Sequence, residues 1–193
     1  MISADRFVAN KQYFHQGWLN ARRGGVTATQ VAKASTPAGF KQAVADYIDD
    51  TQIPDNPYMA FGRDFEPVIA RTVHLEHGVL PNEWLISADG FSHHLATPDG
   101  LSPDHTMISE IKTTGKDWDD GKIPVQYRRQ VQWQLHVTGA ERCLFAWMKR
   151  IEVDGVFAPA WFEPKCLWIE RDEGMIEVLL DTAEELWGKV NHG

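Results

Sequence analysis

Cysteine, long apolar runs and basic charge are all scarce in this 193-residue sequence. Its two cysteines, Cys143 and Cys166, lie far apart and form no CxxC pair, which excludes a disulfide framework and indicates two buried thiols in a reducing cytoplasm. No apolar run approaches the roughly 18 residues needed to cross a membrane. The first residues, Met1 to Arg6, lack a basic stretch followed by an apolar one, so we expect no secretory signal. The sequence predicts a soluble cytoplasmic protein.

Basic side chains are outnumbered, with 19 Lys and Arg against 27 Asp and Glu and a formal net charge of −8. Taken alone, this charge argues against a polyanion partner, because affinity for DNA comes largely from basic groups that displace counterions. The acid is unevenly distributed, however: residues 51–103 carry seven acidic and two basic side chains, and residues 151–193 carry ten and three. We expect the acidic side chains from Glu170 to Glu185 to form the solvated face of a last helix.

No repeat, low-complexity tract or long linker interrupts the chain, so its length predicts one domain over residues 1–193. Helical spacing of apolar residues predicts a helix over 60–77 closed by Gly78, and others at 40–50, 124–139 and 173–190. Short β-rich runs predict strands at 79–88, 91–97, 106–113, 142–150 and 158–169. This order predicts an α/β (α+β) fold in which a mixed sheet is flanked by helices.

Two carboxylates and a lysine stand at a suggestive spacing: Pro98-Asp99 is followed by Glu110-Ile111-Lys112. Residues i and i+2 of a strand point to one face, so Glu110 and Lys112 should share a side of the sheet while Ile111 points into the core. With Asp99 on the adjoining hairpin arm, two carboxylates and a main-chain carbonyl could hold magnesium. Such a cation polarises a phosphoryl oxygen and lowers the pKa of water, while the lysine offsets developing charge.

This pattern is weak by itself, because an Asp in a Pro-Asp-Gly turn and a Glu–Lys alternation on an exposed strand both occur by chance. Glu66, in the middle of the amphipathic helix, is either a further carboxylate near the metal or a surface charge. Tyr127, Gln130 and Gln134 fall on one helical face. That face either binds water or phosphate through its amides or is simply a polar helix surface.

Residues 18–29 combine Trp18, Arg22-Arg23 and hydroxyls at a helix start expected at Thr27 or Thr29. A helix N-terminus with free N–H groups and a guanidinium fork makes a reasonable phosphate pocket, although Ser or Thr before a helix is most often only an N-cap. Four histidines occur as close pairs, but neither pair has a familiar zinc spacing, so we expect solvent-facing side chains: His74, His77, His93 and His94.

Taken together, five segments resemble, in order, the motifs of the lambda exonuclease and YqaJ-type viral recombinase family of PD-(D/E)XK nucleases. They are Gly17–Arg22 through Thr27–Thr29, Phe61–Glu66, Thr97–Gly100, Glu110–Lys112 and Tyr127–Gln132. Five motifs in the right order are far more specific than any one of them. The resemblance implies a restriction-endonuclease-like core.

The resemblance also implies an activity and site residues. It implies a phage-type or prophage-type alkaline exonuclease that digests linear double-stranded DNA 5′ to 3′ to mononucleotides in a bacterial host, leaving a 3′ tail for a single-strand annealing protein. A homotrimeric ring around DNA is implied as well. By position, the metal ligands for two Mg²⁺ ions, or Mn²⁺, are Asp99, Glu110 and the Ile111 carbonyl, with catalytic roles for Lys112, Glu66 and Gln130. The 5′-terminal phosphate would bind Arg22, Thr29 and Thr97, where threonine replaces the usual serine at both hydroxyl positions.

Two other functions are compatible with these residues. A sequence-specific endonuclease can use the same core, because fold does not dictate function. A non-cleaving DNA-binding or annealing module would keep the acids only as structural groups.

Overall fold

The computed structural model describes residues 1–49, 54–118 and 121–191. Within these ranges the strands form two separate mixed sheets, where the sequence predicted one. The helices are α1 (His15–Arg22), α2 (Ala28–Ala34), α3 (Pro37–Asp49), α4 (Pro57–His77), α5 (Val125–Thr138) and α6 (Glu173–Asn191), with a short 3-10 helix at Ala4–Arg6. None of the helices in the described ranges is long and apolar enough to cross a bilayer.

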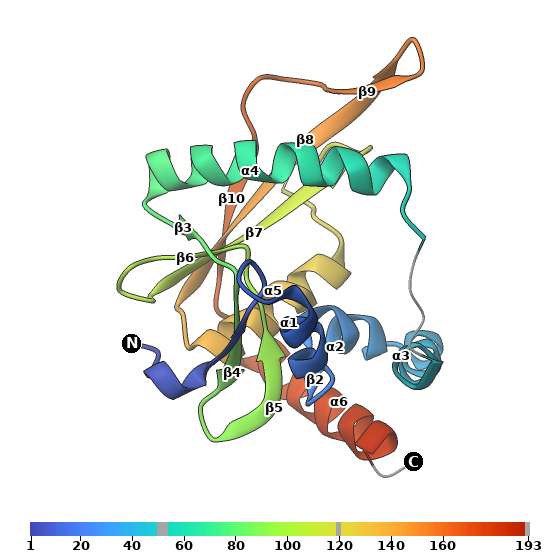
Figure 1. Ribbon diagram of the computed structural model, residues 1–193, viewed down its shortest axis with the longest axis vertical. Coiled ribbons are helices and arrows are strands. Elements are labelled where there is room, and N and C mark those ends of the chain that lie inside the picture. The colour runs from blue at the N-terminus through green and yellow to red at the C-terminus, as the bar shows by residue number, and fades with distance from the viewer. Residues whose placement is uncertain (50–53, 119–120, 192–193) are drawn as a thin grey trace.

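The six-stranded sheet carries the strand with the Glu–Lys alternation. Its strands are β3 (Leu80–Pro81), β6 (Gly100–Leu101), β7 (Met107–Thr114), β8 (Arg142–Val153), β9 (Val156–Pro159) and β10 (Lys165–Glu170), arranged β10-β8-β7-β6-β3 with β9 paired to β8. β7 and β8 are parallel and the other pairs are antiparallel. α4 lies across one face, where Ile69 and Val73 pack on Ile111, and α5 covers the other (Figure 1).

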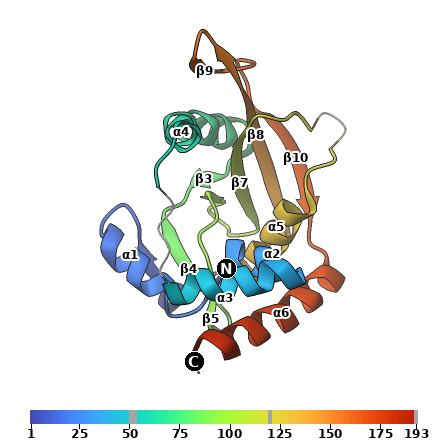
Figure 2. The ribbon, with the colours of Figure 1, turned by 90° about the vertical axis from the view of Figure 1, so that its right-hand side faces the viewer.

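The four-stranded sheet is built largely from the N-terminal region. Its strands are β1 (Phe7–Asn10), β4 (Trp84–Ala88), β5 (Phe91–Ala96) and β2 (Val26–Thr27), in the order β1-β4-β5-β2. Figure 2 shows α2, α3 and α6 stacked below the six-stranded sheet, with α5 between this layer and β7–β8. α5 packs between the two sheets, and its Trp133 and Leu135 are fully buried in the largest core cluster.

The helix predicted over 60–77 is confirmed, but it begins earlier, at Pro57. The Asn56 side chain caps it by accepting hydrogen bonds from the N–H groups of Tyr58 and Met59, each at 3.0 Å. Proline at the first helical position loses no hydrogen bond there. Gly78, with φ of 71°, ends the helix as predicted. The helix predicted at 40–50 is α3, and residue 50 lies outside the described residues.

Two predicted strands are wrong because each is two strands. The 79–88 run splits into β3 and β4 at Asn82, whose side chain donates to the carbonyls of Trp84 (3.0 Å) and Pro98 (2.9 Å) and redirects the chain. The 158–169 run splits into β9 and β10, which pair with different parts of the long β8. β9 is the return arm of a hairpin whose turn, Asp154-Gly155, has positive φ at both residues.

The expectation of two buried thiols holds for one cysteine only. Cys143 is fully buried in β8, whereas Cys166 in β10 is half-buried. Burial raises the pKa of Cys166 to about 11, and it raises the pKa of Cys143 as well. Both thiols therefore stay protonated near neutral pH and are poor nucleophiles.

Candidate active site

The candidate site lies where the chain passes from one sheet to the other. Thr97 directly follows β5 of the four-stranded sheet, and Asp99 directly precedes β6 of the six-stranded sheet. Gly100 pairs with Ser109, which places Asp99 beside Glu110 as the hairpin reasoning predicted. A side chain at Gly100 would meet the Ser109 hydroxyl at 2.3 Å, so only glycine permits this approach of the two strands.

Asp99 and Glu110 are positioned by different means. The Asp99 carboxylate accepts a hydrogen bond from the main-chain N–H of Ile111 at 2.6 Å. Glu110 is almost fully buried, at 2% exposure, and points toward α5. Burial raises the pKa of Asp99 well above its usual value, and the charge of Glu110 raises it further against the opposing effect of Lys112. Two carboxylates thus share a site in which negative charge is only partly compensated.

Two glutamines of α5 hold Glu110. Gln130 donates to Oε1 of Glu110 at 2.5 Å, and Gln134 donates to Oε2 at 2.7 Å. Gln134 is buried, so the alternative of a polar helix surface is wrong for this position. The other side-chain atom of Gln134, Oε1, is buried and has no hydrogen-bond donor among the described residues. An orphaned acceptor beside two carboxylates indicates that a ligand or water completes the site.

Lys112 shares the face of Glu110, as strand alternation predicted, and its ammonium group pairs with Oε1 of Glu110. The same ammonium lies 5.4 Å from the ring centroid of Tyr127. Burial lowers the pKa of Lys112, but the charges of Glu110 and Asp99 outweigh that effect and raise it overall. The two carboxylates therefore favour the charged form of Lys112.

Glu66 extends from α4 toward the opposite edge of the site. It is exposed, and it lines one groove with Lys112 and another with Asp99. Its charge is close enough to contribute to the raised pKa of Asp99. Gly62, one turn earlier, lies against β7, because a Cβ there would meet the Thr113 hydroxyl at 3.3 Å. The structure thus places Glu66 beside the other carboxylates, although its side chain remains in solvent.

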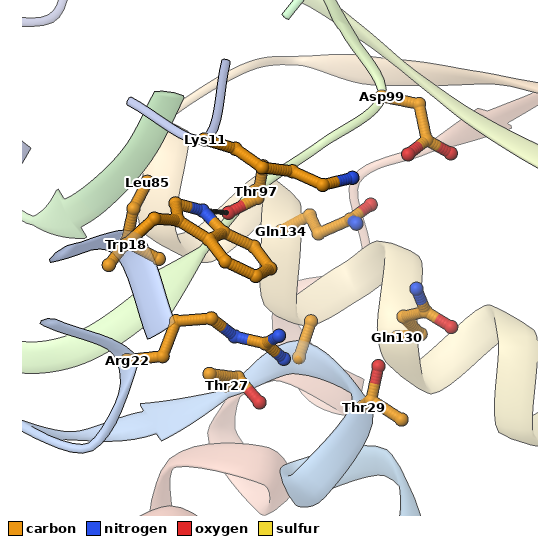
Figure 3. Close-up of a pocket in the computed structure, with 11 residues that line it drawn as sticks. Lys11, Trp18, Arg22, Thr27, Thr29, Leu85, Thr97, Asp99, Gln130 and Gln134 are labelled. Carbon is orange, nitrogen blue, oxygen red and sulfur yellow. Dashed lines mark hydrogen bonds between the residues drawn. The ribbon is translucent and has the colours of Figure 1, made fainter. Parts of the chain in front are cut away.

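Arg22 lies in a cavity next to the carboxylates. Its guanidinium stacks at 4.4 Å on the Trp18 ring, and the Trp18 indole N–H donates to the Thr97 hydroxyl at 3.3 Å (Figure 3). Burial lowers the pKa of Arg22. In the part of the chain that the structure describes, Arg22 has neither a carboxylate nor a hydrogen-bond partner. A fixed, partly desolvated guanidinium without a counter-ion is suited to bind an anion.

The cavity has a volume of about 170 Å³ and joins the predicted phosphate residues to the predicted metal residues. Its lining includes Arg22, Thr29 and Thr97 together with Asp99 and Gln130, and Thr29 lies next to Gln130 (Figure 3). Thr27 is the N-cap of α2, with the capping box completed by Gln30, so Thr29 lies in the first turn. Lys11, which the sequence reasoning missed, also lines this cavity and follows β1, a strand that was not predicted.

The donor set fits a hard divalent cation. Asp99, Glu110 and the Ile111 carbonyl offer oxygen ligands from adjacent strand positions, as magnesium prefers. A cation would offset the two carboxylate charges that burial leaves poorly compensated.

Comparison with known proteins agrees with this geometry. The crystal structure of an alkaline exonuclease, LHK-Exo, from Laribacter hongkongensis has a TM-score of 0.74 and 27% identity over 92% of this chain and 93% of that one. The same protein in complex with dAMP has a TM-score of 0.75 and 28% identity over the same shares. A phage related exonuclease from Haemophilus somnus shares the fold, with a TM-score of 0.64 and 14% identity over 87% of this chain and 94% of that one. These structural relatives support a nuclease.

Relatives by sequence agree. The protein YqaJ of Bacillus subtilis is 26% identical over 199 residues, which cover 95% of this chain and 59% of that protein. The chain therefore spans about 59% of the length of this relative. The model of the YqaJ-like viral recombinase domain matches residues 17–141, a range that contains Arg22, Glu66, Asp99, Lys112 and Gln130. The chain belongs to the YqaJ-like viral recombinase family.

Proposed function

We propose that this chain is a magnesium-dependent exonuclease that digests linear double-stranded DNA from a 5′ end. The observation that carries the proposal is the single cavity shared by Arg22 and Asp99. At about 170 Å³ it has room for a phosphate group. A pocket for an anion directly beside the carboxylates favours an enzyme that binds the terminal phosphate of a DNA strand and cleaves next to it.

The proposed roles of the chain's residues follow from their contacts. A divalent cation, when bound by Asp99, Glu110 and the Ile111 carbonyl, polarises the scissile phosphate and makes water a better nucleophile. Gln130 and Gln134 keep the Glu110 oxygens oriented. Lys112 stays protonated beside Glu110 and offsets the charge that develops on the phosphoryl oxygens. Glu66, at the solvent edge, is placed to orient water.

Digestion in the 5′ to 3′ direction would release 5′-mononucleotides and leave a 3′ single-stranded tail. The alkaline exonuclease LHK-Exo has been solved with dAMP, which is a mononucleotide. We further propose, from the family alone, a homotrimeric ring and an annealing protein that receives the tail.

The deciding experiment is digestion of end-labelled linear duplex, with a 5′ phosphate or a 5′ hydroxyl, in magnesium, manganese, calcium or chelator. We expect magnesium and manganese to support release of mononucleotides, with faster digestion of phosphorylated ends. Closed circular duplex should stay intact.

The other two functions give different results in the same assay. Linearisation of the closed circle would indicate an endonuclease. Binding without digestion in any metal would indicate a non-cleaving module.

A further inference from the structure

Two histidines and a glutamate come together outside the carboxylate site, where α6 packs near β5. His93 and His94 belong to β5, and Glu184 belongs to α6. The ring Nε2 atoms of His94 and His93 lie 2.8 and 3.0 Å from the same Glu184 oxygen, Oε1. One ligand atom from each residue can be chosen so that all three lie within 4.8 Å of one another.

This arrangement contradicts the expectation of solvent-facing histidines. His94 is completely buried and His93 is 23% exposed, although His74 does face solvent. The acidic side chains of α6 are exposed, as predicted, but one of them, Glu184, also contacts both rings.

Consecutive strand residues normally point to opposite faces, so both rings reach one carboxylate only because β5 is irregular. Ser87 of β4 pairs with Leu95, but the next residue, Ala88, pairs with Phe91. Residues 92–94 are therefore out of step with β4, as in a bulge that re-aims side chains. On the other side of β5, a Cβ at Gly25 would lie 2.1 Å from the His93 carbonyl, so the backbone approaches closely there.

Aromatic packing holds the two rings in place. His93 stacks on Trp187 with ring centroids 5.6 Å apart, and His94 stacks on Phe91 at 4.8 Å. The second ring nitrogen of His94, Nδ1, lies 3.1 Å from Nε2 of His136 on α5. A histidine that binds a metal through one nitrogen usually donates its other N–H to an acceptor, and His136 can be that acceptor.

We propose that His93, His94 and Glu184 bind a zinc-type divalent cation at a site separate from the carboxylate site. Two imidazoles and one carboxylate suit zinc or cobalt, whereas magnesium prefers oxygen ligands alone. Ligand bonds of about 2.1 Å in tetrahedral geometry place donor atoms about 3.4 Å apart. The two nitrogen-to-Glu184 separations, 2.8 and 3.0 Å, are close to that spacing. Glu184 is 53% exposed, so water has access to the fourth position.

Such an ion would join α6 to β5. The chain continues from β5 directly to Thr97, which lines the cavity that contains Arg22. The inference does not depend on the proposed nuclease activity, because it concerns other residues and a different class of ion.

The test is a calorimetric titration of zinc into the full chain after chelator treatment, in excess magnesium that occupies the carboxylate site. We expect one zinc per chain. His93→Ala and Glu184→Gln should each weaken zinc binding by on the order of 100-fold. Glu185→Gln makes the same charge change at the next, exposed residue of α6 and should bind zinc as tightly as the parent chain. Glu110→Gln, in the carboxylate site, should also bind zinc as tightly as the parent chain.

Cobalt provides a second measurement. A four-coordinate site with two imidazoles gives intense visible absorption, whereas a six-coordinate oxygen site absorbs weakly. The intense bands should be present in the parent and in Glu110→Gln and absent from Glu184→Gln, whose exposed side chain can be changed without disturbing the core. Three results would each overturn the proposal. They are unchanged zinc affinity in both His93→Ala and Glu184→Gln, a parent chain that does not bind one zinc ion, and loss of zinc binding in Glu110→Gln.

Discussion

Replacing Arg22 with alanine removes the guanidinium that lines the cavity beside Asp99. The side chain is held flat against Trp18 at 4.4 Å and has no carboxylate partner in the described part of the chain. Its charge is therefore available to a ligand rather than neutralised within the protein. A 5′-terminal phosphate carries close to two negative charges and an internal diester carries one, so this group should favour an end.

A charge-assisted hydrogen bond contributes about 1.5–3 kcal/mol, which corresponds to roughly 10- to 150-fold in rate. Because burial removes part of the solvent screening around Arg22, we expect a value in the upper half of that range. Arg22→Ala should slow digestion of 5′-phosphorylated ends by this factor and digestion of 5′-hydroxyl ends much less. The measurement is the initial rate on each substrate, with the melting temperature of each variant recorded.

Arg23→Ala is the matched control, since it removes the same charge one residue later, outside the cavity lining. It should leave the preference for phosphorylated ends intact. Equal loss on both kinds of end in Arg22→Ala would refute the reasoning and make Arg22 a general backbone contact or a packing residue for Trp18.

Other expected outcomes concern catalysis, stability and assembly. Alanine at Asp99, Glu110 or Lys112 should lower turnover by on the order of 100-fold with the circular dichroism spectrum retained, because loss of one electrostatic stabiliser costs about 3 kcal/mol of barrier; near-normal digestion rates would remove that residue from the site. Gln134→Leu should lower the free energy of unfolding in urea by about 1–3 kcal/mol, since buried Glu110 loses a donor; an unchanged midpoint would contradict this. Burial, with the charge of His94, lowers the pKa of His136 from 6.5 to about 4, so the unfolded chain takes up a proton that the folded chain does not. The melting temperature of metal-free protein should fall between pH 6.5 and 4, and less steeply in the variant His136→Gln. Light scattering at micromolar concentration should give the mass of a trimer, and a monomer mass would count against the ring.

Local sequence was enough for the elements whose own spacing specifies them. The helix ending at Gly78 was found because its apolar side chains recur at helical spacing and Gly78 closes it, whereas its start at Pro57 was missed. The common face of Glu110 and Lys112 followed from strand alternation, and the turn at Pro98-Asp99-Gly100 placed Asp99 on the neighbouring arm. The β9 hairpin could also have been found, because Asp154-Gly155 is a typical two-residue turn.

Tertiary structure decided what depends on contacts between distant segments. Which sheet a strand joins is set by long-range pairing, so one apolar run became β3 and β4, and the step from Thr97 to Asp99 became the junction between two sheets. Gln134 looked like a surface amide until the packing of α5 buried it against Glu110.

The histidines of β5 show the same limit most clearly. Regular alternation predicts that His93 and His94 diverge, and only the irregular pairing with β4, together with the docking of α6, brings both to Glu184. The spacing of apolar residues and the residue types that form turns are encoded over a few positions, so the sequence alone determined the elements that depend on them. The partners of buried polar groups are chosen by the packing of elements some 90 residues apart, and only the folded chain determines those.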